Sequence, residues 1–162
     1  MAAPMTYRVN GVQYIAIVAG YGGGQVTAGA ALDPQSADYR YGNEGRVIAL
    51  KIGGPVPSLP ALYTEPALPE PPARPTDAAQ IAAGEVLFNR YCSRCHLMAR
   101  GNFPDLRYMN AATHALFGDI VLGGAYQGKG MGRFDDVLSA ADAQAVHSYV
   151  IDQAWRLKEA KP

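Results

Sequence analysis

A proline-rich segment divides the chain into two parts of different character. Eight of the 12 prolines lie between Pro55 and Pro75. Proline has no backbone N–H and its ring fixes φ, so this segment cannot form a helix or a central strand and favours an extended polyproline II conformation. The sequence therefore predicts a first region over residues 1–54, a semi-rigid linker over residues 55–76 and a second domain over residues 77–162.

The first region has the pattern of β-strands. Residues 5–9 and 13–19 alternate in character and are rich in Tyr, Ile and Val, and the hairpin signal Asn10-Gly11 lies between them. Residues 46–52 predict a third strand, and the glycine-rich residues 20–24 predict a loop. Three strands do not make an independently stable sheet. We therefore expect this region to be part of a larger β structure or to pack against the rest of the chain.

The second region has the pattern of helices. Asp77, or Thr76 before it, is placed to cap a helix that runs to about Tyr91. Gln80 is placed to complete a capping box with Asp77. Residues 111–122 predict one or two further short helices. The region is therefore expected to be mainly α.

A final helix should begin after Ser139, with Asp142 as its acidic partner in the first turn. The apolar stripe of this helix includes Tyr149, and that of the first helix includes Gly84. A glycine there allows two helix backbones to approach closely, and the tyrosine supplies an aromatic contact. The pattern therefore predicts that the first and last helices cross at Gly84.

The chain has two cysteines, and both lie in the sequence Cys92-Ser93-Arg94-Cys95-His96. Cys-x-x-Cys-His is the attachment signature of c-type haem. The two thiols add to the two vinyl groups of one porphyrin edge, and the histidine that follows is held beneath the iron as an axial ligand. We therefore predict that haem c is bound covalently to Cys92 and Cys95, with His96 on the iron.

The same motif has other uses. A structural zinc site would need a second pair of Cys or His ligands, and His114 and His147 do not have that spacing. A thioredoxin-like redox pair would need a βαβ context, which the pattern does not show. A structural disulfide would leave His96 without a role. Haem attachment is favoured, and a zinc-binding structural module is kept as an alternative.

Haem iron in electron-transfer cytochromes usually takes a second axial ligand, often Met. Met131 lies 35 residues after His96, and the glycines on both sides of it let a loop fold against the porphyrin and direct the sulfur to the iron. With both axial positions filled, no position on the iron is open to substrate, which favours electron transfer over an enzyme such as a haem peroxidase. The other candidate ligands are less suited by position: Met98, Met109, His114 and His147.

A histidine that binds a metal is normally oriented through its other ring nitrogen. The carbonyl of Pro104 is the candidate acceptor for His96, because proline has no N–H and its fixed φ would hold that carbonyl in place.

Charge and hydropathy exclude two classes of partner. Lys and Arg number 14 and Asp and Glu number 14, and the balance also holds from Asp77 onward, with nine of each, and before it, with five of each. No basic stripe is present, so nucleic acid is not expected as a partner. The apolar runs are far shorter than the roughly 20 residues that span a bilayer, so no membrane insertion is expected. Residues 1–4 lack the features of a secretory signal peptide.

These motifs together resemble a known family. Residues 77–158 resemble a class I cytochrome c domain, and residues 104–108 and 130–139 resemble the cytochrome fused to pyrroloquinoline quinone (PQQ) dehydrogenases. The first region resembles the final propeller blade of those enzymes in four segments, residues 3–7, 13–17, 19–23 and 45–50. The chain is similar to the C-terminal portion of a type II quinohaemoprotein alcohol dehydrogenase. It departs from the usual family pattern at Leu97, where glycine commonly follows the haem histidine.

The resemblance implies a division of labour. In that family a β-propeller holds PQQ and calcium and oxidises an alcohol, and electrons pass to the fused haem and then to an external acceptor, either a small redox protein or an artificial mediator. It implies that this chain holds the last strands of an incomplete blade and the haem, with no catalytic residues of its own. Tyr21 and the glycines around it match a family loop near the quinone. Without the other blades they are not expected to form a PQQ site. Arg107 would face a haem propionate or the propeller surface, and the alternative is an arginine that only contacts solvent.

The resemblance also implies a setting and leaves an alternative. Haem c is attached outside the bacterial cytoplasm, so the periplasm is expected. A chain without a signal peptide is then expected to be part of a longer protein. The alternative is a cytochrome c that works alone as a periplasmic shuttle.

Overall fold

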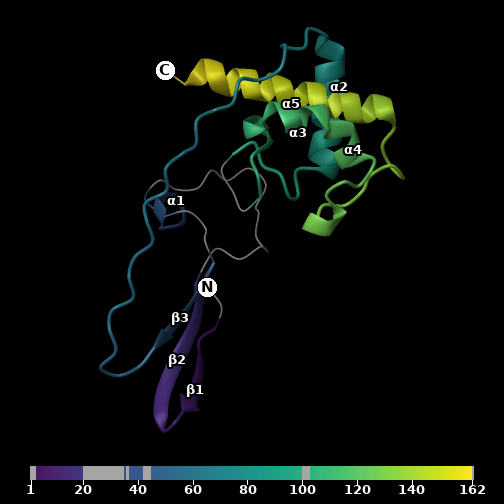
Figure 1. Ribbon diagram of the computed structural model, residues 1–162. Coiled ribbons are helices and arrows are strands. Elements are labelled where there is room, and N and C mark those ends of the chain that lie inside the picture. Colours follow the sequence, from purple (N-terminus) through teal and green to yellow (C-terminus); the bar gives the residue numbers. More distant parts are fainter. Residues whose placement is uncertain (1–2, 20–34, 36, 42–44, 100–102, 162) are drawn as a thin grey trace. The chain divides into compact units, whose positions relative to one another are not determined.

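The computed structural model describes residues 3–19, 35, 37–41, 45–99 and 103–161. The chain forms two compact units, Met1–Glu65 and Pro66–Pro162 (Figure 1). The boundary between them falls inside the proline-rich segment. The two units are described separately below.

The first unit contains a three-stranded antiparallel sheet in the order β1-β2-β3. The strands are β1 (Met5–Val9), β2 (Val12–Ala19) and β3 (Arg46–Leu50). Asn10 and Gly11 both have positive φ, at 50° and 78°, as the tight turn between two twisted strands requires. The three strands and the hairpin predicted from the sequence are confirmed. The short helix α1 (Ala37–Tyr41) was not expected.

The sheet keeps much of its apolar surface in contact with solvent. Tyr7 and Tyr14 stack across β1 and β2 with ring centroids 5.3 Å apart. In contrast, the exposed fractions of Met5, Val18 and Val47 are 63%, 51% and 75%. A sheet with such exposed apolar side chains fits the expectation that these strands need a further partner surface. The glycine-rich residues 20–24 lie outside the described part of the chain.

The second unit is helical. Its long helices are α2 (Ala78–Tyr91) and α5 (Ala140–Ala160), and its short helices are α3 (Ala111–Ala115) and α4 (Phe117–Val121). Two 3₁₀ turns, η1 (Leu106–Tyr108) and η2 (Gln127–Lys129), lie in the connections. Residues 111–122 therefore form two short helices rather than one. Among the described residues, no helix has the length and apolar character needed to cross a membrane.

The helix caps explain where the long helices begin. Ser139 and Asp142 form a reciprocal capping box at the start of α5, as predicted. The Asp77 side chain accepts from the N–H groups of residues 79 and 80 at the start of α2. The predicted capping box with Gln80 is wrong, because the Gln80 side chain turns to α5, where its oxygen accepts a 2.9 Å hydrogen bond from Ser148.

Helices α2 and α5 cross with their backbones in close contact (Figure 1). A Cβ atom at Gly84 would lie 2.0 Å from the carbonyl oxygen of Ala145 and 3.0 Å from the Cβ of Tyr149. Phe88 packs against Tyr149 with ring centroids 5.4 Å apart. The predicted crossing at Gly84 is confirmed, and only a residue without a side chain fits there.

The hydrophobic core of the second unit is centred on this crossing. Its buried members come from α2, α4 and α5, from the residue after η1 and from the loop before α5: Phe88, Met109, Phe117, Val121, Leu138, Ala143, Val146, Tyr149 and Val150. Val146 and Val150, both on α5, are almost completely buried. Helix α5 therefore forms the centre of the unit.

Two histidines that the sequence left without a role form a pair beside this core. The Nδ1 atom of His114 on α3 lies 2.9 Å from the Nε2 atom of His147 on α5. His147 also stacks on Phe117, with ring centroids 4.3 Å apart. Burial lowers the pKa of His114, and burial together with the neighbouring His114 lowers the pKa of His147 to about 4. Both rings are therefore neutral at pH 7.

We predict that Gly84→Ala costs about 3 kcal/mol or more of the free energy of unfolding, because the added methyl group must push α2 away from α5. Gly118→Ala is the matched control, since Gly118 is also helical but a Cβ there meets nothing within 4 Å. That control should be neutral or gain up to about 1 kcal/mol. Denaturant unfolding measures both, and equal effects would contradict the crossing.

The histidine pair predicts a loss of stability in mild acid. Because the folded pKa of His147 lies below the unfolded value, the unfolded chain binds more protons between pH 6.5 and about 4, and the free energy of unfolding falls over that window. With allowance for partial exposure we expect about 1 kcal/mol between pH 7 and pH 5. His147→Gln should flatten this part of the curve in thermal melts. An unchanged pH profile in that variant would contradict the assignment.

Candidate haem-attachment site

The Cys-x-x-Cys-His motif forms a tight turn at the end of α2. Cys92 is the C-cap of the helix, and its N–H donates to the carbonyl of Phe88. The N–H groups of Cys95 and His96 both donate to the carbonyl of Cys92, over 3.1 and 2.9 Å. The end of α2 thus gathers the three side chains, and Phe88 ties that end to the crossing with α5.

The two thiols are free of each other and differ in exposure. Cys92 is half-buried and packs against the hydrophobic core, and Cys95 is exposed. Burial, with a smaller contribution from Cys95, raises the pKa of Cys92 to about 11. Cys92 is therefore a neutral thiol at pH 7, which is not the state of a redox nucleophile. The part of the chain that the structure describes also has no group of three or more His, Cys, Asp or Glu side chains placed to hold a metal ion.

The ring of His96 is oriented through one nitrogen. Its Nδ1 atom lies 3.0 Å from the carbonyl oxygen of Pro104. A carbonyl can only accept, so Nδ1 carries a proton and donates, and Nε2 takes no part in this contact. Phe103 lies edge-on to the ring, with centroids 6.3 Å apart. This is the tautomer that an imidazole needs to bind iron through Nε2.

Met131 lies in the loop that directly follows η2, and a backbone hydrogen bond holds this loop. The loop leaves η2 through Gly130, whose φ of 89° lies in the left-handed region. The Met131 N–H then donates to the carbonyl of Tyr126 over 3.2 Å, and the Lys129 ammonium lies 4.2 Å from the centre of the Tyr126 ring. The half-buried Met131 side chain packs against the same core cluster as Cys92.

The other candidate ligands have different surroundings. Met109 is buried in the core with 8% exposure. His114 and His147 bond to each other, an arrangement that no local sequence signal predicts because the residues are 33 positions apart. Met98 also packs against the core cluster but lies two residues after His96.

Arg107 is held by a carboxylate of the same chain segment. Its guanidinium makes a bidentate ion pair with Asp105, with a shortest distance of 2.6 Å, and both side chains are largely buried. Asp105 also accepts from the Arg107 N–H at the start of η1. The pair fixes the segment that directly follows Pro104, and therefore supports the carbonyl that faces His96.

The donor set fits a c-type haem. Two thiols lie one turn apart at the end of a helix, and the next residue is an imidazole whose Nδ1 faces a carbonyl oxygen, so that Nε2 is the nitrogen left for a metal. A thioether lies on the same apolar core as the first thiol. Apolar surroundings, an imidazole and a thioether are the environment of haem iron in electron-transfer cytochromes.

Comparison with known proteins agrees with this chemistry. Residues 79–150 match the family described as cytochrome c oxidase, cbb3-type, subunit III. Among curated proteins the chain is 36% identical to quinohaemoprotein alcohol dehydrogenase ADH-IIG of Pseudomonas putida, over 98% of this chain and 22% of that protein. It is 31% identical to lupanine 17-hydroxylase [cytochrome c] of a Pseudomonas species, over 96% and 22% of the respective lengths.

The chain is also similar to solved structures of quinohaemoprotein alcohol dehydrogenases. The structure of ADH-IIG from Pseudomonas putida matches 99% of this chain and 23% of its own, with a TM-score of 0.77 and 31% identity. The chain is homologous to the C-terminal region of quinohaemoprotein alcohol dehydrogenases. It spans about a fifth of the length of these relatives. Its second unit is a cytochrome c domain, which implies covalently bound haem c and fits a role in electron transfer.

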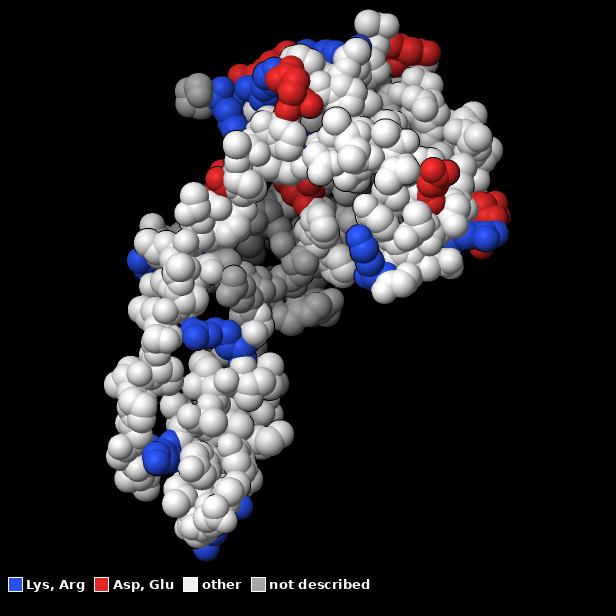
Figure 2. Space-filling view, in the orientation of Figure 1, with Lys and Arg blue, Asp and Glu red and all other residues white. Residues whose placement is uncertain are grey.

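The charges on this unit carry no strong bias. On the face of the second unit shown in Figure 2, both basic and acidic side chains are present. Neither sign of charge therefore dominates this face of the second unit. Steering of a strongly charged partner to this face is not indicated.

The Met131 loop predicts a contrast between two glycines. Gly130→Ala should cost about 1 kcal/mol of the free energy of unfolding, because an alanine disfavours the left-handed backbone that turns the chain into Met131. Gly128→Ala is the control, since a Cβ there meets nothing within 4 Å and its φ is not positive. Denaturant unfolding measures both variants. Equal losses in the two variants would contradict this account of the loop.

Proposed function

We propose that this chain is a single-haem electron-transfer unit in which Cys92 and Cys95 hold the haem covalently and His96 and Met131 are the axial ligands of its iron. The observation that carries the ligand assignment is the 3.0 Å contact between His96 Nδ1 and the Pro104 carbonyl, which leaves Nε2 as the metal-binding nitrogen. When bound, the haem supplies a one-electron couple.

The residues around the site serve this couple in separate ways. The Pro104 carbonyl keeps the His96 ring in one tautomer and orientation, and the Arg107–Asp105 pair keeps the segment after Pro104 in place. Met131 would hold the iron through its thioether sulfur, which would leave no position for an exogenous ligand and would favour the reduced iron. Cys92 and Met131 pack against the apolar core. Such apolar surroundings would keep water from the haem and would also favour the reduced iron.

The relatives suggest the donor and the acceptor. We propose that the strands of the first unit are the last strands of a propeller blade and that a PQQ-containing propeller part is the electron donor. The support is that the similarity to quinohaemoprotein alcohol dehydrogenases covers the strands as well as the cytochrome. The same continuity disfavours a cytochrome that works alone. We further propose a soluble redox protein or mediator as the acceptor and the periplasm as the location.

The catalytic step is assigned to another part of such an enzyme. The resemblance places the quinone, calcium and catalytic groups in earlier propeller blades, so we propose that this chain does not oxidise alcohols alone. Its described residues supply ligands and a path for electrons through one haem.

The optical spectrum tests the ligand assignment. We predict that Met131→Ala abolishes the sulfur-to-iron charge-transfer band of the oxidised protein and lowers its reduction potential, because the thioether is lost from the iron. Met98→Ala is the matched control, because Met98 packs against the same core, and it should keep both. A band that persists in Met131→Ala, or disappears in Met98→Ala, would contradict the assignment.

A further inference from the structure

The histidine pair is a buried titratable group that the proposed haem site does not use. The 2.9 Å contact between His114 Nδ1 and His147 Nε2 joins α3 to α5, and the two rings stack with centroids 5.2 Å apart. His114 is only 7% exposed, and its Nε2 atom is buried with no hydrogen-bond partner among the described residues. The His114 ring is therefore held through Nδ1, and its other nitrogen has nothing to donate to.

This arrangement cannot take up a proton without loss. In the neutral pair one of the two facing nitrogens carries the hydrogen and the other accepts it. The hydrogen is favoured on His114 Nδ1, because the other tautomer would bury an N–H at Nε2 without an acceptor. A proton added to His147 Nε2 then sets two donors against each other. Protonation therefore weakens the link between α3 and α5.

The surroundings of the pair oppose a charge on it. Burial lowers the pKa of His114, and burial together with His114 lowers the pKa of His147 to about 4. The charge that acts on His147 is thus a second histidine rather than a carboxylate. Helix α3 has no Asp, Glu, Lys or Arg, and the charged residue of α4, Asp119, is exposed to solvent.

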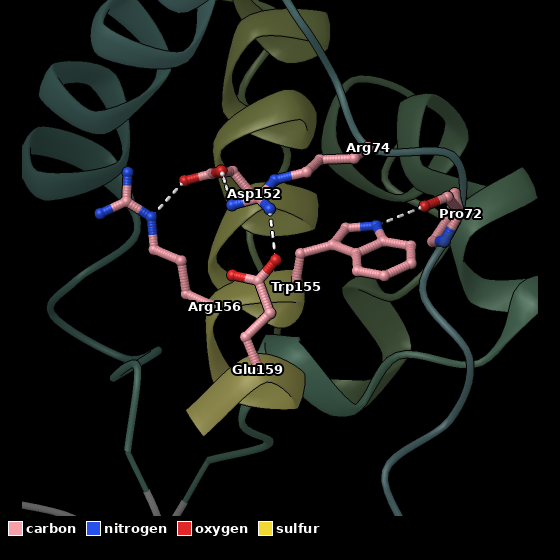
Figure 3. A network of polar contacts seen from close by, with 6 residues as sticks. All are labelled: Pro72, Arg74, Asp152, Trp155, Arg156 and Glu159. Carbon is pink, nitrogen blue, oxygen red and sulfur yellow. Dashed lines mark hydrogen bonds and ion pairs between the residues drawn. The ribbon is translucent and has the colours of Figure 1, made fainter. Parts of the chain in front are cut away.

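The charged side chains of α5 all make contacts elsewhere: Asp142, Asp152, Arg156, Lys158 and Glu159. The buried Asp152 lies 3.4 Å from Arg74 of the proline-rich segment and 2.6 Å from Arg156 (Figure 3). Nearby, the indole N–H of Trp155 donates to the carbonyl of Pro72 over 2.8 Å, so this part of the predicted linker is docked on the helix. The charges of α5 are therefore balanced away from the histidine pair.

The pair is connected to α4 through Phe117. The ring of His147 lies flat on that of Phe117, with centroids 4.3 Å apart and planes 8° apart. Phe117 is the first residue of α4, is 6% exposed, and belongs to the hydrophobic core. Helix α3 ends at Ala115, two residues earlier. The two histidines therefore hold both short helices against α5.

Both ends of the loop that carries Met131 are bonded to α4. Just after the helix, the N–H of Ala125 donates to the carbonyl of Asp119 over 3.1 Å. Beyond Met131, the N–H of Phe134 donates to the carbonyl of Val121 over 3.0 Å. Residues 122–134 thus form a closed loop with its base on α4. A displacement of α4 from α5 would therefore also displace Met131.

We propose that His114 and His147 are positioning residues for Met131: through Phe117 and α4 they keep its loop closed, and in mild acid their protonation opens the loop locally while α2 and α5 stay folded. The open form binds more protons than the closed form between pH 6.5 and about 4, so acid favours it over that window. The opening of the loop is independent of the haem ligands, whereas the release of the iron by Met131 rests on the proposed function.

Imidazole binding to the haem-loaded 162-residue chain measures the open population, because imidazole reaches the iron only after Met131 has left it. Loss of the sulfur-to-iron charge-transfer band reports the binding. We expect the ratio of imidazole affinities, unaltered chain over His147→Gln, to rise about fivefold from pH 7 to pH 5, with allowance for the partial exposure of His147. The protonation of imidazole itself cancels in this ratio.

Ser148→Ala is the matched control for His147→Gln. Ser148 is the next residue on α5 and is also buried, and its hydroxyl donates to Gln80 of α2 over 2.9 Å. Its replacement removes a hydrogen bond of α5 but no group that titrates near neutral pH. The variant should therefore keep the pH dependence of the unaltered chain.

Amide hydrogen exchange of the unaltered, haem-loaded chain tests the loop without any substitution. The Phe134 amide reports on the bond between the loop and α4, and the amide of the fully buried Val150 reports on α5. We expect Phe134 to be less protected than Val150 at pH 7, because the loop opens locally. Its protection factor should then fall about fivefold by pH 5, because that opening exposes the histidine pair.

The proposal is overturned if the affinity ratio is the same at pH 7 and pH 5, or if Ser148→Ala loses the pH dependence as His147→Gln does. It is also overturned if the Phe134 amide is as protected as that of Val150, or if its protection does not change with pH. A charge-transfer band missing from the unaltered chain at pH 7 would instead contradict the assignment of Met131. The Phe134 amide would then decide the proposal alone.

Discussion

The close contact of α2 and α5 at Gly84 is the constraint on which the second unit depends. It packs α2 against the centre of the hydrophobic core. The position of the C-terminal end of α2 relative to that core follows from this contact. The haem motif lies at that end, with Cys92 as the C-cap, so the crossing places the attachment site relative to the core. The same helix α5 then packs against α4, carries His147 and receives the proline-rich segment. One close helix contact thus positions the core of the unit and the end of α2 that carries the Cys-x-x-Cys-His motif.

Around this frame, different parts of the chain contribute separate pieces of one chemistry. In the proposed site, the end of α2 would supply the thiols and the imidazole, the segment before η1 the orienting carbonyl, and the loop after η2 the thioether. Each of these segments is held by a local interaction. These are the cap at the end of α2, the ion pair between residues 105 and 107, and the left-handed Gly130 before Met131. With both proposed ligands bound and an apolar wall beside it, such an iron would transfer electrons without being open to substrate.

What the sequence could predict was what local rules determine. The hairpin turn at Asn10-Gly11 and the capping box at Ser139 depend on neighbouring residues, and the haem motif has a fixed spacing. The crossing could be predicted because the apolar stripe of the first helix contains a glycine and that of the last helix contains a tyrosine. The histidine pair, the Gln80–Ser148 contact and the clamp between Arg74 and Asp152 join residues 33, 68 and 78 positions apart. No local pattern specifies such pairs, and in the last case a correct propensity for extended structure concealed a docked segment.

The central claim is that one haem is attached covalently to Cys92 and Cys95. The most direct measurement is extraction of the folded, coloured protein with acidified acetone, followed by the mass and the reduced spectrum of the protein. The account predicts that the colour stays with the protein, that the mass exceeds that of the chain by one haem, and that replacing both cysteines with alanine lets the haem pass into the solvent. Colour that is extracted from the unaltered protein, or a colourless chain that binds zinc, would contradict it.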